Sequence, residues 1–457
     1  DMTSVVVTVN IGSLAEDADL KYQGLAHFLE HMLFLGSVKC PKMDEYNNLI
    51  NSNGGSSNAY TENTKTTYHF SIYNNFLDKA LDIFSRFFID PLFNPEFVNK
   101  ELQAVHSEHS KNINNDGWCS DYFKDIISKK DSIINRFKTG NLSSLDKPGI
   151  RDEMIKFYNK YYIPSNISIV NTSSLDNDVM TDKINKTFGN IPKKTEQNII
   201  INKPLYPSGN QYYFLKSNDD IYKLTYIWEI PHTDNFKDTH LPWIITSVIN
   251  SKNENSLKQF LIKKGLIKGI SSYVVSYGSI ILDIYMHDFH NWQEIDSYIR
   301  HYINSLQNHN WYDIIDYYKK KDKIYFDYSS KEESLNLALF ISSNIFDYPI
   351  EKVYSGPSIV ENIDDKGMIR LLANLNFDNN KIILSSKEKP ITSSIIFKDE
   401  YREPYYNLIY YSIELKFIEP QKIYYEIITE NEFLDTKPEL ILNLDDTINP
   451  TLVSNYG

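Results

Sequence analysis

The stretch GLAHFLEHMLFLGS, residues 24–37, constrains the fold of this chain more than any other part of its sequence. Its apolar residues recur on every side of a helix predicted over residues 24–35, and a helix of that kind belongs inside a protein. Three of its side chains, His27, Glu30 and His31, are nevertheless polar. Buried polar groups need hydrogen-bond or ionic partners, so the fold must bring partners to these three side chains.

The spacing of these residues is typical of a metal site. His27 and His31 are four residues apart, so both imidazoles project from one helix face and can bind one metal ion. With Glu30 they form H-x-x-E-H, the inverted form of the zinc-binding H-E-x-x-H helix. Zinc favours two nitrogens, one carboxylate and an open position for water, so a third ligand must come from elsewhere. Chance could also place two histidines on a helix, but the apolar flanks disfavour a solvated His/Glu face.

A second helix, predicted over residues 94–111, offers the third ligand. Five residues at i, i+4, i+7, i+8 and i+11 share one stripe that is expected to face the core: Phe97, Glu101, Ala104, Val105 and Glu108. Buried carboxylates need a cation or hydrogen-bond donors. The alternative is a merely solvated stripe, which is the favoured interpretation for Glu101 taken alone. His106 and His109 lack the i, i+4 spacing, so we expect surface or packing roles for them.

The rest of the pattern alternates between strands and helices and predicts an α+β fold. We expect a strand over 4–10, a helix over 43–52, a strand at the end of 58–73 and a helix over 76–88. Tyr68, Phe70 and Ile72 should share the buried face of their strand. Residues 269–303 repeat the turn, strand and helix of residues 54–88, which puts His240 near the position of His27. No Glu-His pair follows His240, so the second copy is predicted to lack the metal chemistry.

A polar segment with two prolines, residues 193–209, marks the predicted domain boundary. We predict a metal-binding domain over 1–198, a linker over 199–209, a second domain without the metal motif over 210–440, and the start of a connector over 441–457. Strand-like residues begin directly after Asp1, so we expect upstream residues to have been removed or left out of the numbering.

Charge and cysteine content argue against other classes of function. The formal net charge of -13 disfavours nucleic acid or an anionic membrane surface as a partner. Cys40 and Cys119 are too few for a disulfide framework and are not spaced as a thiolate metal site. A reducing compartment and cytoplasmic localisation are therefore expected, with Cys40 inert. No apolar run approaches the roughly 20 residues of a membrane helix.

With these motifs in place, the sequence resembles the M16 metallopeptidases, and within them the insulysin (insulin-degrading enzyme) branch. Four stretches carry the resemblance, in the order and at the separations typical of the family: GLAHFLEHMLFLGS followed by CPK, GGSSNAYTENTKTTYHF, ELQAVHSEHSKN and NEFLDTKPELI. Together they span nearly the whole chain. The resemblance implies two homologous α/β-sandwich domains, each a mainly antiparallel sheet packed against helices.

The resemblance also implies a catalytic site in the first domain. His27, His31 and Glu108 would bind Zn²⁺. Glu30 would be the general base, and Glu101 a supporting acidic residue. The implied protein is a zinc metalloendopeptidase of the inverted-zincin type, which hydrolyses short or unfolded peptides with a zinc-activated water.

The implied partners are peptides and a second half of the enzyme. Asn58 and Ala59 would lie on an edge strand that binds the peptide backbone by β-augmentation, which requires an unpaired substrate backbone. Insulysins consist of two homologous halves, and this sequence corresponds to the first. A C-terminal half, on the same or a separate polypeptide, is therefore expected, and a homo-oligomer stays open. Residues 250–260, NSKNENSLKQF, replace a Gly-rich segment that helps insulysins anchor the substrate N-terminus, so retention of that subsite also stays open.

Two other functions remain as alternatives. One is a non-catalytic M16-fold scaffold or assembly subunit, which the intact ligands and base disfavour. The other is an organellar processing peptidase subunit, which the insulysin-like GGSSNAYTENT and the lack of a visible leader disfavour.

Overall fold

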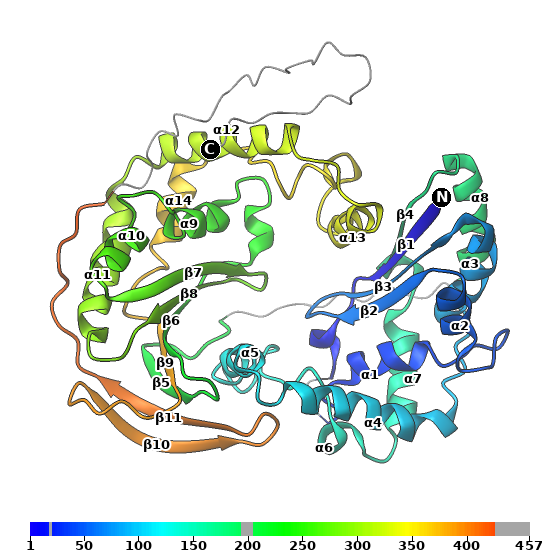
Figure 1. Ribbon diagram of the computed structural model, residues 1–457, viewed down its shortest axis with the longest axis horizontal. Helices are drawn as coiled ribbons and strands as arrows, with labels where there is room; N and C mark the ends of the chain where they lie inside the picture. The colour runs from blue at the N-terminus through cyan, green and yellow to red at the C-terminus, as the bar shows by residue number, and fades with distance from the viewer. Residues whose placement is uncertain (18–20, 193–203, 426–457) are drawn as a thin grey trace, which may run out of the picture.

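The computed structural model describes residues 1–17, 21–192 and 204–425, which form two units lying side by side (Figure 1). We refer to the described parts of residues 1–192 as the first unit and to residues 204–425 as the second unit. The first unit contains β1 (Met2–Val9), α1 (Leu25–Leu33), α2 (Glu45–Ser52), β2 (Ser56–Thr61), β3 (Thr66–Tyr73), α3 (Leu77–Ser85), α4 (Pro95–Asn112), α5 (Asp116–Ile126), α6 (Leu142–Leu145), α7 (Ile150–Tyr161), β4 (Ile167–Thr172) and α8 (Asn177–Phe188). The second unit contains β5 (Gln211–Lys216), β6 (Tyr222–Glu229), α9 (Leu241–Ile249), α10 (Leu257–Lys263), β7 (Ile267–Val275), β8 (Ser279–Met286), α11 (Trp292–Ser305), α12 (Trp311–Asp327), α13 (Ser334–Asn344), α14 (Asp365–Leu372), β9 (Lys381–Ser386), β10 (Ile395–Glu403) and β11 (Leu408–Leu415).

The sheet of the first unit has the strand order β2-β3-β1-β4, and all neighbouring strands are antiparallel. The β-branched run of β1 suits a central strand, and its Val5 and Val7 side chains are fully buried. β2 lies at the edge of the sheet, and α1 runs beside it (Figure 1). An edge strand therefore lies next to the helix that carries the metal-binding motif.

The sheet of the second unit is larger but repeats this arrangement. Its strand order is β10-β11-β5-β9-β6-β8-β7, and β5 with β9 form its parallel pair. Within it, β7-β8-β6-β9 has the same order and antiparallel pairing as β2-β3-β1-β4. The predicted α+β fold, with two related and mainly antiparallel sheets packed against helices, is confirmed.

The two units are packed against each other over an apolar core. Side chains from both contribute to it, including Phe123 and Phe137 from the first unit and Tyr406 from the second. Helix α13 of the second unit also packs on β1 and β4 of the first, where the hydroxyls of Thr8 and Ser342 lie 2.6 Å apart. Residues of the second unit can therefore support side chains of the first.

The helices around the motif confirm the sequence predictions to within two residues at each end. The helix expected over 24–35 is α1, and the one expected over 94–111 is α4. The run 58–73 differs, because it holds two strands, β2 and β3, joined by a turn in which the Glu62 N–H donates to the Lys65 carbonyl at 2.8 Å. Tyr68, Phe70 and Ile72 of β3 are fully buried, as predicted.

Some predictions fall outside the described residues. The connector at 441–457, the stretch NEFLDTKPELI and most of the segment 193–209 are among them. The domain boundaries at residues 198 and 440 stay predictions. Within the described ranges, no helix is long and apolar enough to cross a bilayer.

Candidate metal centre

Helix α1 is fixed at its N-terminus by a buried glutamate. Gly24, directly before the helix, has a left-handed φ of 91°, and a Cβ there would lie 2.2 Å from the Cα of Gly140. The Glu16 carboxylate accepts the N–H groups of Gly24 at 3.0 Å and Ala26 at 3.1 Å, which satisfies donors at the helix start. The apolar face of α1 is buried. Together these contacts set the rotation of α1 and hence the direction of its three polar side chains.

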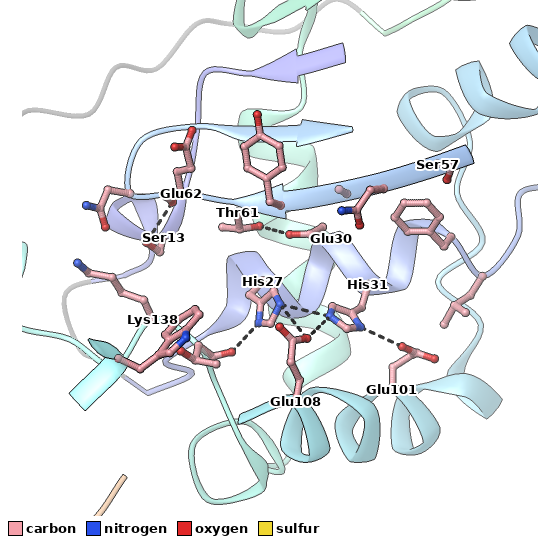
Figure 2. A pocket seen from close by; sticks show the side chains of 18 of the residues that line it. Ser13, His27, Glu30, His31, Ser57, Thr61, Glu62, Glu101, Glu108 and Lys138 are labelled. Atoms are coloured by element: carbon pink, nitrogen blue, oxygen red, sulfur yellow. Dashed lines mark hydrogen bonds and ion pairs between the residues drawn. The ribbon is translucent and has the colours of Figure 1, made fainter. Parts of the chain in front are cut away.

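His27 and His31 point toward Glu108 of the neighbouring helix α4 (Figure 2). The two Nε2 atoms are 3.3 Å apart. Oε2 of Glu108 lies 3.6 Å from His27 Nε2 and 3.4 Å from His31 Nε2. Four ligands around a tetrahedral zinc ion with bonds of about 2.0–2.1 Å would be separated by about 3.3–3.4 Å. The donor types and their spacing therefore fit a zinc ion, and within the described ranges this is the group of His, Cys, Asp and Glu side chains that does so.

Both histidines use their other ring nitrogen for a contact with the protein. His27 Nδ1 donates to the carbonyl of Thr139 at 2.7 Å, and His31 Nδ1 lies 3.3 Å from Oε2 of Glu101. Such contacts fix the tautomer and the ring orientation of metal-binding histidines. Glu101 thus contacts the ring nitrogen of His31 that faces away from the donor cluster, whereas Glu108 contacts the nitrogen that belongs to the cluster.

Glu30 lies beside the two histidines but faces the sheet. Its side chain is buried, and Oε2 accepts a hydrogen bond of 2.6 Å from the hydroxyl of Thr61, the last residue of β2. Burial raises the pKa of the Glu30 carboxyl, although His27 and the Thr61 hydrogen bond partly oppose this. A carboxyl with a raised pKa, next to a candidate metal position, is suited to accept and return a proton.

The carboxylates of this centre favour a positive charge at its middle. Burial lowers the pKa of His31, but hydrogen bonds with Glu101 and Glu108 outweigh that effect and raise the pKa to about 9. The same hydrogen bond to His31 lowers the pKa of Glu108. A cation at this position, whether a proton or a metal ion, is therefore stabilised.

The centre opens into a pocket of about 750 Å³ (Figure 2). One wall is β2, where Asn58 pairs with His69 of β3 and Ala59 pairs with Tyr68. Asn58 and Ala59 both line the pocket. Their strand pairs with β3 on one side only, so its other side is an edge of the sheet. The structure thus brings the edge strand next to the donor cluster, while the peptide-binding role of Asn58 and Ala59 stays a prediction.

The predicted buried stripe of α4 is wrong in detail. The buried residues of α4 are Val98, Leu102, Val105 and His109, so only Val105 of the predicted stripe is buried. The side chains of Glu101 and Glu108 are 13% and 45% exposed, at the border of that stripe. These two carboxylates therefore line the wall of a pocket and not the core.

Several residues of the pocket are absent from the sequence predictions, and two of them hold residues of the motif. Thr61 holds Glu30, and Thr139 holds His27 through its carbonyl, which every residue type possesses. Trp118 of α5, 46% exposed, and Lys138 also line the pocket. Lys138 is paired with Asp125 at 2.7 Å, so its charge is compensated within the first unit.

The structure agrees with the expectation that His109 and Cys40 play no chemical part. His109 is buried, and its Nε2 donates to the carbonyl of Tyr405 at 2.7 Å, which confirms a packing role. Cys40 is buried, and burial raises the pKa of its thiol, so it is kept in the unreactive protonated form.

Comparison with known families accounts for most of the chain. Residues 1–129 match the model described as insulinase (peptidase family M16). Residues 150–313 match the peptidase M16 inactive domain, and residues 326–454 match the middle or third domain of peptidase M16. All three matches are to domains of the M16 peptidase family.

Individual relatives agree with this class. A Schizosaccharomyces pombe protein named as a zinc protease, mug138, is 28% identical over 402 residues, which are 84% of this chain and 41% of that protein. The insulin-degrading enzyme of Drosophila melanogaster is 29% identical over 379 residues, 78% of this chain and 37% of the enzyme. The chain therefore spans less than half the length of these curated relatives.

Solved structures show the same fold. The crystal structure of pitrilysin superposes with a TM-score of 0.83 at 23% identity, covering 90% of this chain and 44% of pitrilysin. A protease from Helicobacter pylori superposes with a TM-score of 0.67 at 17% identity, covering 84% of this chain and 94% of that one. The chain belongs to the M16 peptidase family, and it is an insulysin-like member.

Proposed function

We propose that this chain is the zinc-binding half of a metalloendopeptidase that hydrolyses short or unfolded peptides. The observation that carries the proposal is the cluster of His27 Nε2, His31 Nε2 and Glu108 Oε2, separated by 3.3–3.6 Å, with the Glu30 carboxylate beside it. Membership of a peptidase family supports the reaction class. The donor set, and the naming of one relative as a zinc protease, support zinc.

The three donor residues and Glu30 have different roles in the proposed peptide hydrolysis. His27, His31 and Glu108 would hold the ion, which when bound polarises a peptide carbonyl and acidifies a water. Glu30 takes the proton from the attacking water and then delivers it to the leaving amine. The hydrogen bond from the Thr61 hydroxyl to Oε2 fixes the orientation of the Glu30 carboxylate for this transfer.

The edge strand gives a physical reason for selecting unfolded peptides. An extended peptide can add its backbone to the free edge of β2, where Asn58 and Ala59 lie, whereas a folded chain has no unpaired backbone to offer. Thr61 of the same strand holds the base. The register of the peptide on β2 would therefore set the distance between the scissile bond and Glu30.

The direct test is cleavage of an unstructured fluorogenic peptide by the purified, zinc-loaded chain. The Glu30→Gln variant should lose about 10²–10⁴-fold in rate, because a general base of this kind contributes that much, and should keep its zinc. Glu96→Gln is the matched control, since this exposed glutamate lies on α4 but does not line the pocket. Its rate and zinc content should equal those of the wild type.

Two results would contradict parts of this proposal. Equal cleavage by Glu30→Gln and wild type would remove Glu30 from the mechanism. Absence of cleavage by a zinc-loaded wild type would show that this chain does not act alone, and the assay would then be repeated with a C-terminal half added. If a cell that carries Glu30→Gln keeps full function, the scaffold alternative is favoured.

We further propose that the partner of this chain is a C-terminal half, on the same or a separate polypeptide, and that the protein acts in the cytoplasm. The greater length of the relatives supports the first point, since the matched region is 41% of one and 37% of another. The second point is supported by the small number of cysteines.

A further inference from the structure

The turn between β10 and β11, residues 404–407, reaches with Glu403 at the end of β10 from the second unit to the metal-binding side of the first. The Glu403 carboxylate accepts the N–H groups of Tyr405 at 2.8 Å and Tyr406 at 2.9 Å, and Asn407 has a left-handed φ of 53°. Glu403 is buried and also accepts the hydroxyl of Tyr122 on α5 at 3.1 Å. The turn is therefore held in one conformation, with both tyrosines in contact with the first unit.

Tyr406 contacts the residue that orients His27. Its hydroxyl lies 3.0 Å from Oγ1 of Thr139, and the carbonyl of Thr139 accepts the Nδ1–H of His27 at 2.7 Å. Tyr406 is only 3% exposed, so its hydroxyl depends on protein partners. One side-chain hydrogen bond thus connects the second unit to a residue that holds a candidate metal ligand.

Tyr405 supports the same part of the first unit by further contacts. Its ring stacks on Phe137, with centroids 4.2 Å apart and planes at 8°. Its carbonyl accepts the hydrogen bond from His109. Phe137 lies two residues before Thr139, and His109 directly follows Glu108. The turn therefore contacts the segment that carries Thr139, which holds His27, and the part of α4 that carries the donor Glu108.

We propose that Tyr406 is a positioning residue of the metal centre, which acts through Thr139 to fix the orientation of His27. The inference rests on the proposed zinc site. Its physical basis is that an imidazole anchored at Nδ1 keeps its Nε2 lone pair directed at the ion, and outer contacts of this kind change metal affinity or activity. It follows that the second unit, which supplies no donor atom to the cluster, sets part of the metal affinity of the first.

The test uses the full chain and measures zinc affinity by competition with a chelator. Tyr406→Phe removes the hydroxyl and keeps the ring, and we expect affinity to fall about 3- to 10-fold, less than the 10–100-fold typical of a directly bonded outer partner. Thr139→Val removes the opposite hydroxyl. The double variant should bind zinc no more weakly than either single variant, because all three lose the same contact.

Two further measurements separate positioning from packing. The visible absorption spectrum of the Co²⁺-loaded chain reports ligand geometry, and it should change in Tyr406→Phe and in Thr139→Val. Tyr410→Phe is the matched control, because this tyrosine lies in β11 of the same hairpin and no hydrogen bond of its hydroxyl is found among the described residues. Its zinc affinity and Co²⁺ spectrum should equal those of the wild type.

The outcomes distinguish failure of the inference from failure of the proposed function. If Tyr406→Phe lowers the melting temperature of the zinc-free chain but leaves zinc affinity and the Co²⁺ spectrum unchanged, Tyr406 is a packing residue and the inference is wrong. Additive losses in the double variant would also contradict it. If the wild type binds no zinc, the proposed function fails and the inference fails with it.

Discussion

The two units follow the same chain path, but the cluster of candidate metal ligands belongs to the first. Strands β1, β2 and β3 with helix α1 correspond in order and pairing to β6, β7 and β8 with helix α9. Each helix begins directly after a left-handed residue, Gly24 with a φ of 91° before α1 and His240 with a φ of 51° before α9. Counted from the helix starts, His240 takes the place of Gly24, three residues earlier than the position of His27.

The two histidines and the glutamate of α1 are not repeated in α9. Counted in the same way, Trp243, Thr246 and Ser247 take the places of His27, Glu30 and His31. The order of buried and accessible positions is nevertheless the same along the two helices, except that Trp243 is more exposed than His27. A helix at this place in the fold therefore packs well without two histidines and a glutamate. Their presence in α1 is explained by chemistry and not by packing, because a buried carboxylate is costly without a partner.

The largest loss of zinc affinity is expected for a variant that removes a donor from the first unit and so makes it more like the second. Glu108→Ala removes one donor and leaves two imidazoles, so we expect zinc affinity to fall by more than about 100-fold, beyond the effect of outer contacts. Because the Glu108 side chain is 45% exposed, loss of its contact with His31 should lower the melting temperature of the zinc-free variant only slightly. Zinc content after dialysis against buffered zinc checks the prediction. Retention of zinc would mean that another residue supplies the third ligand.

A smaller effect is expected for Glu101, which contacts His31 from behind. Glu101→Leu removes the partner of His31 Nδ1, and we expect zinc affinity to fall about 10- to 100-fold. The zinc affinity of Glu101→Gln should lie between those of Glu101→Leu and the wild type, because the amide oxygen of the glutamine still accepts the Nδ1–H of His31. Chelator competition measures both. Equal affinities in all three proteins would show that Glu101 does not support the centre.

The smallest effect on zinc affinity is expected for a substitution in the second unit. His240 is buried, and its Nε2 donates to the Gly356 carbonyl at 2.9 Å. His240→Ala leaves that carbonyl without its partner, so the free energy of unfolding should fall by about 1–3 kcal/mol. Zinc affinity should not change, since His240 corresponds to a capping position and not to a ligand. Denaturant unfolding and zinc titration provide the two readouts, and weakened zinc binding would contradict the comparison.

The donor cluster could be predicted because its signals are local. Two histidines one helical turn apart, in an otherwise apolar helix, specify a shared direction and a need for partners. The error on α4 has a physical cause, since periodicity identifies a stripe but not how deeply each edge of that stripe is buried. Glu101 and Glu108 therefore appeared as core positions, although they line the wall of a pocket.

Contacts between distant segments could not be predicted from the sequence. Tyr406 and Thr139 are 267 residues apart, and no periodicity relates them. Thr139 holds His27 through its backbone carbonyl, so its side chain carries no signal of that role. The turn between β2 and β3 was missed for another reason. Its sequence, ENTK, contains neither Gly nor Pro, the residues that most often mark turns.

The central claim is that one zinc ion lies between α1 and α4 in the first unit. The most direct measurement is anomalous diffraction at the zinc absorption edge from crystals of the zinc-loaded chain. Our account predicts one peak per chain, bonded to His27 Nε2, His31 Nε2 and a Glu108 carboxylate oxygen, and no peak beside α9. A chain without a peak between these helices, or with its zinc held by other residues, would contradict it.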